Sequence, residues 1–180
     1  DVKIEGVPFN PTAEMKAMSP NKESLEMSIE GMGAIIKQKF NGETGYMEQQ
    51  GQRKALTDEE LVDKKSEHSI IPELYYDLSK VSFESMTTIE GNDVFKIKVK
   101  GTKNDSFRYY DANSGYLIRI ESTIEAQGQS MLSTVDYGNY SPVNGVQFPY
   151  SQTVISGPQV INFNFTNIKV NEGVSDADFD

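Results

Sequence analysis

The sequence has no cysteine and only one histidine, His68, among its 180 residues. Zinc sites with ordinary His/Cys ligation are therefore excluded, as is catalysis by a cysteine nucleophile. A Ser-His-Asp triad would depend on His68 alone, and no G-x-S-x-G segment accompanies it. We expect His68 to be a solvated residue near the end of a polar helix, where its charge favours the helix dipole.

Long apolar runs are also missing. The longest are only a few residues, as at 34–36, far below the roughly 20 that a membrane-spanning helix needs. The sequence is therefore not expected to be an integral membrane protein. It opens without the apolar segment of a signal peptide, as expected either of a processed chain or of a piece of a longer one.

Positive charge is in short supply, since 17 basic residues stand against 27 acidic ones and the net charge is -10. Binding to nucleic acid requires clustered Lys and Arg, and an acidic protein repels the phosphate backbone. Anionic membrane surfaces are disfavoured for the same reason. We expect no nucleic-acid partner.

Alternation of apolar and polar residues dominates the sequence. From Ser24 onwards, Leu25, Met27 and Ile29 point to one side and the residues between them to the other, which is typical of a half-buried strand. Strands are predicted at 24–30, 34–40, 44–50, 83–90, 94–100, 106–111, 116–124 and about 130–140, 146–156 and 160–170. Residues 1–23 are expected to be irregular, with 2–4 as a potential edge strand, because prolines interrupt them.

Turn residues separate these strands. Asn41-Gly42 predicts a tight type I′ hairpin, because both residues tolerate a positive φ. The segment 111–115, DANSG, predicts a second hairpin.

The periodicity changes only over residues 57–80, where a helical insertion is expected. The segment 57–60, TDEE, offers a capping box at its start. A second helix is predicted to begin near Pro72, with Leu74, Tyr75 and Leu78 as its apolar positions.

Successive strands without intervening helices require antiparallel pairing. The predicted fold class is mainly β (α+β): a strongly curved antiparallel sheet or incomplete β-barrel, with the helical segment covering its concave side. We expect an irregular segment or edge strand at 1–23 and a single domain over 24–180.

Carboxylates could perform acid–base chemistry without histidine. Residues 58–60 lie in a first helical turn, where acids are ordinary. Asp176, Asp178 and Asp180 lie in a tail expected to be mobile and solvated, with a weak calcium site as the alternative. We expect neither a metal site nor a cofactor, and no enzymatic activity.

The apolar residues include nine Phe, nine Tyr and seven Met. Flexible thioethers and aromatic rings fill cores, but they also suit the lining of a cavity that accepts an acyl chain. The candidate cavity residues are Met27, Ile29, Phe40, Tyr46, Leu61, Leu74, Leu78, Phe95, Ile97, Phe148, Phe163 and Phe165.

An ordered series of motifs resembles bacterial envelope domains of the lipoprotein-sorting, LolA-like family. It consists of KFNGETGY (39–46), FRYYDANSGYLIR (107–119), DY (136–137), NGVQFP (144–149), KVN (169–171) and VSD (174–176). Related domains also occur as non-catalytic C-terminal parts of insulinase-type zinc peptidases, but this sequence has no H-x-x-E-H motif.

The resemblance implies an incomplete barrel whose helices cover its open side, in the periplasm or cell envelope. It implies a hydrophobic partner, either a lipid or the acyl chain of a lipidated protein, held between sheet and helices. In the sorting carriers an arginine on the sheet holds the helical lid, and none of Arg53, Arg108 and Arg119 matches its position. The alternative is a non-catalytic interaction or accessory domain without a ligand, either on its own or as part of a peptidase-like protein.

Overall fold

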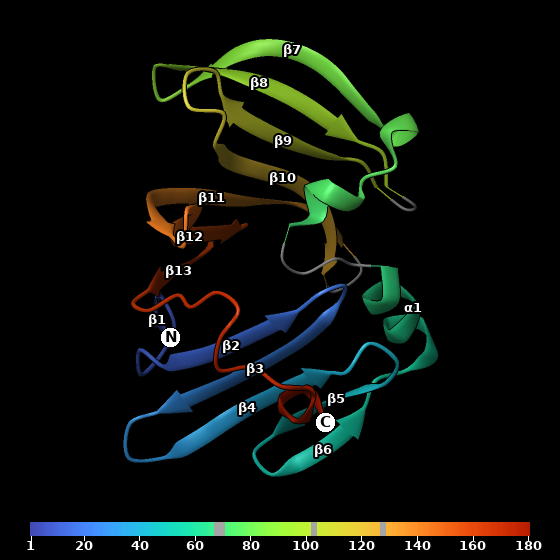
Figure 1. Cartoon of the computed structure of the whole chain (residues 1–180), viewed down its shortest axis with the longest axis vertical. Coiled ribbons are helices and arrows are strands. Elements are labelled where there is room, and N and C mark those ends of the chain that lie inside the picture. The colour runs from blue at the N-terminus through green and yellow to red at the C-terminus, as the bar shows by residue number, and fades with distance from the viewer. Residues whose placement is uncertain (67–70, 102–103, 127–128) are drawn as a thin grey trace. The chain divides into compact units, whose positions relative to one another are not determined.

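The computed structural model describes residues 1–66, 71–101, 104–126 and 129–180, and most of them form β-strands (Figure 1). The strands are β1 (Val2–Glu5), β2 (Thr12–Met18), β3 (Lys22–Ile29), β4 (Gly33–Phe40), β5 (Gly45–Gln49), β6 (Gln52–Ala55), β7 (Val81–Ile89), β8 (Asn92–Val99), β9 (Ser106–Asp111), β10 (Leu117–Ala126), β11 (Gln129–Val143), β12 (Val146–Ser156) and β13 (Gln159–Phe165). The helices are α1 (Asp58–Ser66) and the short 3-10 helices η1 (Pro72–Tyr75), η2 (Leu78–Lys80) and η3 (Asp176–Phe179).

One antiparallel sheet of 13 strands contains all of these strands, in the order β6-β5-β4-β3-β2-β1-β13-β12-β11-β10-β9-β8-β7. The sheet ends on two different strands and is therefore not closed. This confirms the predicted fold class, a mainly β protein with an unclosed antiparallel sheet. The two edge strands differ, since β6 has 4 residues and is polar, whereas β7 has 9 residues and contains no Lys, Arg or Pro.

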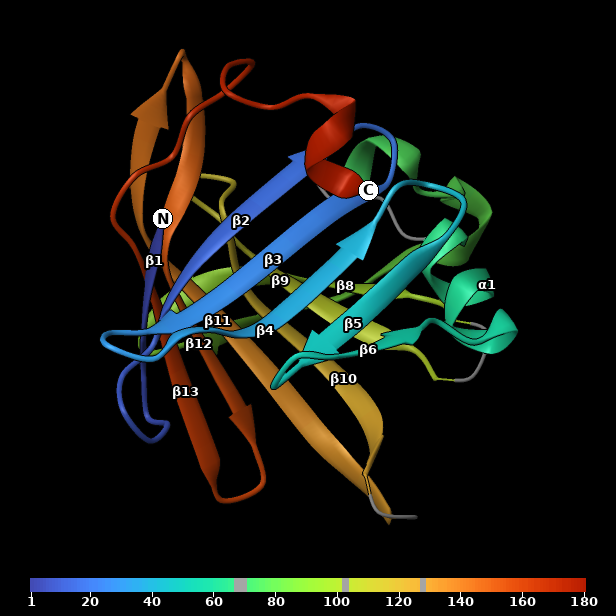
Figure 2. The ribbon, with the colours of Figure 1, turned by 90° about the horizontal axis from the view of Figure 1, so that it is seen from below.

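The chain divides into two compact units. Unit 1 comprises Asp1–Tyr75, Val143–Gly145 and Phe165–Asp180. Its strands β2 to β5 lie side by side in chain order (Figure 2). Met27 pairs with Ala13 on one side and Ile36 on the other, so these side chains share one face. The buried apolar side chains of this unit are Val2, Ile4, Ala13, Phe40 and Phe179.

Unit 2 comprises Tyr76–Pro142 and Val146–Asn164, and so contains β7 to β10 in full. Its registers place Phe83, Ile97 and Arg108 opposite one another on three neighbouring strands. Val94 and Tyr109 are its buried apolar residues.

The N-terminal segment differs from the prediction of irregular structure. Residues 2–5 and 12–18 form β1 and β2, and β1 lies inside the sheet rather than at its edge. The alternation of Ala13 with its polar neighbours is a strand pattern, and the prolines all lie outside the two strands. The prolines bound these strands and do not prevent them, which is the physical reason for the difference.

The hairpin at Asn41-Gly42 is confirmed, because β4 pairs with β5, but its expected two-residue turn is wrong. Residues 41–44 form a longer loop, in which the Asn41 side-chain oxygen accepts hydrogen bonds from the backbone N–H groups of Glu43 (3.1 Å) and Thr44 (3.0 Å). This side chain takes the role of a backbone acceptor, so no tight turn is needed. A two-residue turn with both φ angles positive occurs instead at Glu90 (51°) and Gly91 (83°), as type I′ geometry requires.

The hairpin at 111–115 is confirmed. The Asp111 carboxylate accepts hydrogen bonds from the backbone N–H groups of Asn113 (3.1 Å) and Ser114 (2.7 Å) and from the Ser114 hydroxyl (2.7 Å). These bonds, led by those from Ser114, lower the pKa of Asp111. Gly115 then adopts a φ of 75°, and β10 begins two residues later.

The helical insertion is confirmed at its start and differs towards its end. The Thr57 backbone N–H donates to Glu60 (2.7 Å) and the Glu60 N–H donates to the Thr57 hydroxyl (3.4 Å), which is the expected capping box. The second helix is replaced by η1 and η2. Asp77 accepts a hydrogen bond from the Ser79 N–H (3.0 Å), so it caps the start of η2 and separates this helix from η1.

Candidate ligand-binding surface

An exposed apolar face lies on strands β7 and β8 of unit 2. Phe83 pairs with Ile97 and Met86 pairs with Phe95, and all four side chains share one face of the sheet. The Phe83 and Phe95 rings meet edge to face, with centroids 6.4 Å apart and planes at 64°. Solvent exposure is 61% for Phe83, 56% for Met86 and 38% for Phe95. Adjacent exposed side chains of this size mark binding surfaces more often than isolated ones.

The same face continues across the unit to β13. On β10 it includes Ile120 and Ser122, and Ser122 pairs with Ser133 of β11. The Ser133 and Ser156 hydroxyls are 3.1 Å apart, which places these two residues of β11 and β12 on one face. Gln152 shares this face by alternation and pairs with Phe163. The structure thus brings Phe95, Ile97 and Phe163 onto one face of unit 2.

Arg108 lies in the middle of this face. It pairs with Ile97 on β8 and with Ile120 on β10. Its Nη1 donates a hydrogen bond to the Ser106 hydroxyl (2.9 Å), and its guanidinium carbon lies 4.9 Å from the centre of the Tyr76 ring. Its Nε is buried, and among the described residues it has no hydrogen-bond partner.

The opposite face of unit 2 carries several charged side chains with partners. Arg119 binds Asp136 through two hydrogen bonds, one of 2.9 Å from Nη2. Lys96 lies over the Phe107 ring, 4.2 Å from its centre. The Tyr109 hydroxyl donates to Glu121 (2.6 Å), and burial together with this bond raises the pKa of Tyr109. Arg108 differs from Arg119 in that no carboxylate of the described residues lies within ion-pair distance.

Unit 1 has an apolar face of its own, with α1 attached to it. Met27, Ile36 and Met47 belong to this face by their registers, and Met47 is 43% exposed. Lys64 of α1 forms an ion pair with Glu23, which pairs with Phe40 on the same face. This contact explains how a helix with few apolar residues is held on the sheet.

The candidate cavity residues lie in both units, and within unit 1 they do not all share one face. Tyr46 lies on the opposite face of unit 1, because it pairs with Lys39 and not with the Met27 row, and Arg53 stacks on its ring at 3.8 Å. Leu74 and Leu78 are 74% and 81% exposed. The remaining candidates are divided between unit 1 (Met27, Ile29, Phe40, Leu61, Phe165) and unit 2 (Phe95, Ile97, Phe148, Phe163).

A depression of about 350 Å³ lies elsewhere, in unit 1. Its lining includes Lys3, Glu14 and Glu26, and none of the candidate cavity residues contributes to it. Glu14 lies 3.6 Å from Lys16, and Glu26 lies 3.4 Å from Lys37. This is a polar recess with paired charges, and the predicted apolar cavity stays a prediction.

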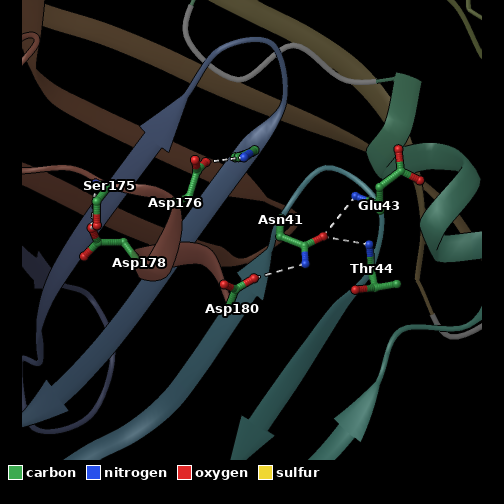
Figure 3. A network of polar contacts seen from close by, with 8 residues as sticks. Asn41, Glu43, Thr44, Ser175, Asp176, Asp178 and Asp180 are labelled. Carbon is green, nitrogen blue, oxygen red and sulfur yellow. Dashed lines mark hydrogen bonds and ion pairs between the residues drawn. The ribbon is translucent and has the colours of Figure 1, made fainter.

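Lysines pair with the carboxylates of Asp176 and Asp178, and the segment is held against unit 1, so the expected mobile tail and its alternative as a calcium site are both wrong. Figure 3 shows the hydrogen bonds that the Asp178 carboxylate accepts from Ser175 and the Asp180 carboxylate accepts from Asn41. Asp178 also accepts from Lys16 (2.6 Å), Asp176 pairs with Lys22, and Lys39 donates to the Asp180 backbone oxygen (2.9 Å). Phe179, between these acids, is 1% exposed. The tail is fixed by one buried ring and a set of ion pairs.

Metal-ligand geometry is not found in the part of the chain that the structure describes, which contains no group of three or more His, Asp or Glu side chains able to hold an ion. His68 lies outside the described residues. Among the helices that are described, none combines the length and the apolar character needed to cross a membrane.

Comparison with known proteins gives a clear result for structure and none for sequence. No family model matches the chain, and no curated protein matches it. A LolA superfamily protein from Nitrosomonas europaea has a similar structure, with a TM-score of 0.65 at 10% identity over 99% of this chain and 86% of that one. The chain has a LolA-like fold.

Two further structures share the LolA-like fold. A putative outer membrane lipoprotein-sorting protein domain from Vibrio parahaemolyticus aligns with a TM-score of 0.61 and 9% identity. A DUF1329 family protein from Desulfovibrio piger aligns with a TM-score of 0.62 and 9% identity. Each alignment covers 99% of this chain and 86% of the other. The motif series in the sequence therefore identified the fold correctly, and the suggested link to peptidases finds no support.

Sequence reasoning did not place Arg108 on this apolar face. It was considered only as a match to the lid-holding arginine of the sorting carriers. The alternation of Ser106, Arg108 and Tyr110 gives the face on β9, but only the register with Ile97 and Ile120 shows that this face is apolar. That register depends on turn lengths and on a bulge in β10, which the residue pattern does not reveal.

Proposed function

We propose that this protein is a cell-envelope binding protein, located in the periplasm, that holds a hydrophobic ligand against the apolar face of unit 2. The ligand class is a lipid or the acyl chain of a lipidated protein. The observation that carries the proposal is the exposure of Phe83, Met86 and Phe95 side by side on one face. A ligand that covers these side chains removes their apolar area from water, and this favours binding by about 25 cal/mol of free energy for each Å² buried.

The LolA-like fold supports this proposal from a second direction. One structural neighbour is described as a lipoprotein-sorting protein domain, and its alignment spans nearly the whole of this chain. Fold alone does not determine function, so the apolar face carries the argument. A ligand-free accessory role is not favoured, because it leaves these exposed side chains without a purpose.

Binding is tested with Nile red, a fluorescent hydrophobic probe, and with mass spectrometry of the native protein for co-purifying lipid. We expect saturable Nile red binding to the unmodified protein and at least a tenfold weaker affinity for Met86→Asp, because a carboxylate on the apolar face has to be desolvated by the probe.

Thr87→Asp is the matched control, since Thr87 is exposed on the other face of the same strand. It adds the same charge to β7 and should leave Nile red affinity unchanged. Equal affinities for the unmodified protein and Met86→Asp would show that the probe binds elsewhere. Absence of saturable binding, together with absence of bound lipid, would refute the proposal.

A further inference from the structure

Arg108 is a charged group in an apolar setting, and the part of the chain that the structure describes gives it no ionic partner. Ile97 and Ile120 flank it on the neighbouring strands, so both cross-strand neighbours are aliphatic. The other arginine of unit 2, Arg119, binds Asp136 with two hydrogen bonds. A buried donor without a partner costs free energy, and more so when the group is charged.

The contacts that Arg108 does make leave donors unused. A guanidinium has five N–H groups, and one of them, on Nη1, donates to the Ser106 hydroxyl. The Tyr76 ring attracts the charge through its π-electrons but accepts no conventional N–H bond from Nε. The Nε side of a guanidinium is a fork that fits two oxygens of one carboxylate or phosphate.

We propose that Arg108 binds the anionic head group of an amphiphilic ligand whose acyl chain lies along the apolar face of unit 2. This inference rests on the proposed function and names its ligand class as a carboxylate or phosphate joined to an acyl chain. Tyr76 now covers the guanidinium, so the ring has to tilt or move aside as the head group reaches Nε. Phe95 and Phe163, on the same face as Arg108, provide apolar surface for the chain.

Isothermal titration calorimetry on the full chain at pH 8 tests this with three probes of equal chain length: decanoate, decyl phosphate and decanol. We expect at least one of the two anions to bind tenfold or more tightly than the neutral alcohol, because hydrogen bonds to charged groups are strong. Preference for decanoate would indicate a fatty acid, and preference for decyl phosphate a phospholipid.

Arg108→Gln should remove the preference for the anion, so that each anionic probe binds with an affinity close to that of decanol. Arg53→Gln is the matched control, because Arg53 belongs to unit 1 and stacks on Tyr46, and the preference should persist in it. Equal affinity of the unmodified protein for all three probes overturns the inference and leaves the proposed function standing. This comparison uses only the unmodified protein, so it does not depend on whether a variant folds. A preference that survives Arg108→Gln also overturns it. Failure of all three probes to bind refutes the proposed function itself.

Discussion

At the residue scale, Phe179 anchors the C-terminal segment. Its ring is 1% exposed although it is the penultimate residue, and η3 contacts β3. Ion pairs at a surface contribute little each, so the buried ring should supply most of the stabilisation.

Phe179→Ala is therefore expected to destabilise the protein by about 3 kcal/mol, in the usual range for removing a buried aromatic side chain. The measurement is the free energy of unfolding from urea denaturation. Val174→Ala, at a side chain that is 38% exposed in the same segment, should cost less than half as much. Similar losses for both variants would show that Phe179 packs less closely than its burial indicates.

At the element scale, η3 and its ion pairs should respond to acid. The hydrogen bond from Lys16, followed by those from the backbone and hydroxyl of Ser175, lowers the pKa of Asp178 to about 2 from the usual 3.8. A lowered pKa in the folded state means that the stabilisation is complete above the ordinary pKa and is lost as pH falls through about 2.

We expect the backbone amides of 175–180 to lose protection from hydrogen exchange between about pH 4 and pH 2, the window between the unfolded and folded pKa values. Asp178→Asn should weaken protection at neutral pH and make it less dependent on pH within that window. An unchanged pH profile in Asp178→Asn would show that other groups, such as Asp176, control the response.

The elements also show how far sequence reasoning reaches. Alternation and local turn chemistry predicted most strands, the capping box at Thr57 and the hairpin at Asp111, because these depend on neighbours in the chain. The split of the second helix at Asp77 and the attachment of the tail through Phe179 were missed. The cap at Asp77 is a local contact with Ser79, and it competes with the apolar spacing that favoured one continuous helix. The attachment of Phe179 depends on contacts with residues far away in the chain, which a local pattern does not contain.

The candidate site was less predictable than the fold. Phe95 and Ile97 were named from alternation, and the registers place them on one face with Phe163. Tyr46 was expected on the same face as Met27, but the register puts it on the other face. A shift of one residue in strand pairing moves every side chain of the strand to the opposite face, and the sequence alone does not fix that register. The place of Arg108 on the apolar face follows only from the pairing of β9 with β8 and β10.

At the scale of the whole molecule, the net charge of -10 should control exchange with membranes. An acidic protein is repelled by an anionic bilayer, and the repulsion extends over roughly 30 Å at 0.01 M salt and 8 Å at 0.15 M. We expect Nile red to pass more slowly to the protein from phosphatidylglycerol vesicles than from phosphatidylcholine vesicles at low salt.

Raising the salt concentration should narrow this difference, because screening shortens the range of the repulsion. Stopped-flow fluorescence measures both transfer rates. Rates that are equal at low salt, or a difference that salt does not change, would mean that net charge has no part in the approach to the membrane.

Strand β7 has a consequence for the protein's behaviour in solution. It is an edge strand of 9 residues that leaves one row of backbone groups unpaired and exposes Phe83 and Met86 beside them. Such an edge is a template on which another chain can add a strand, and apolar side chains strengthen the contact. A bound ligand would cover those same side chains. We therefore expect the ligand-bound protein to resist aggregation better than the ligand-free protein.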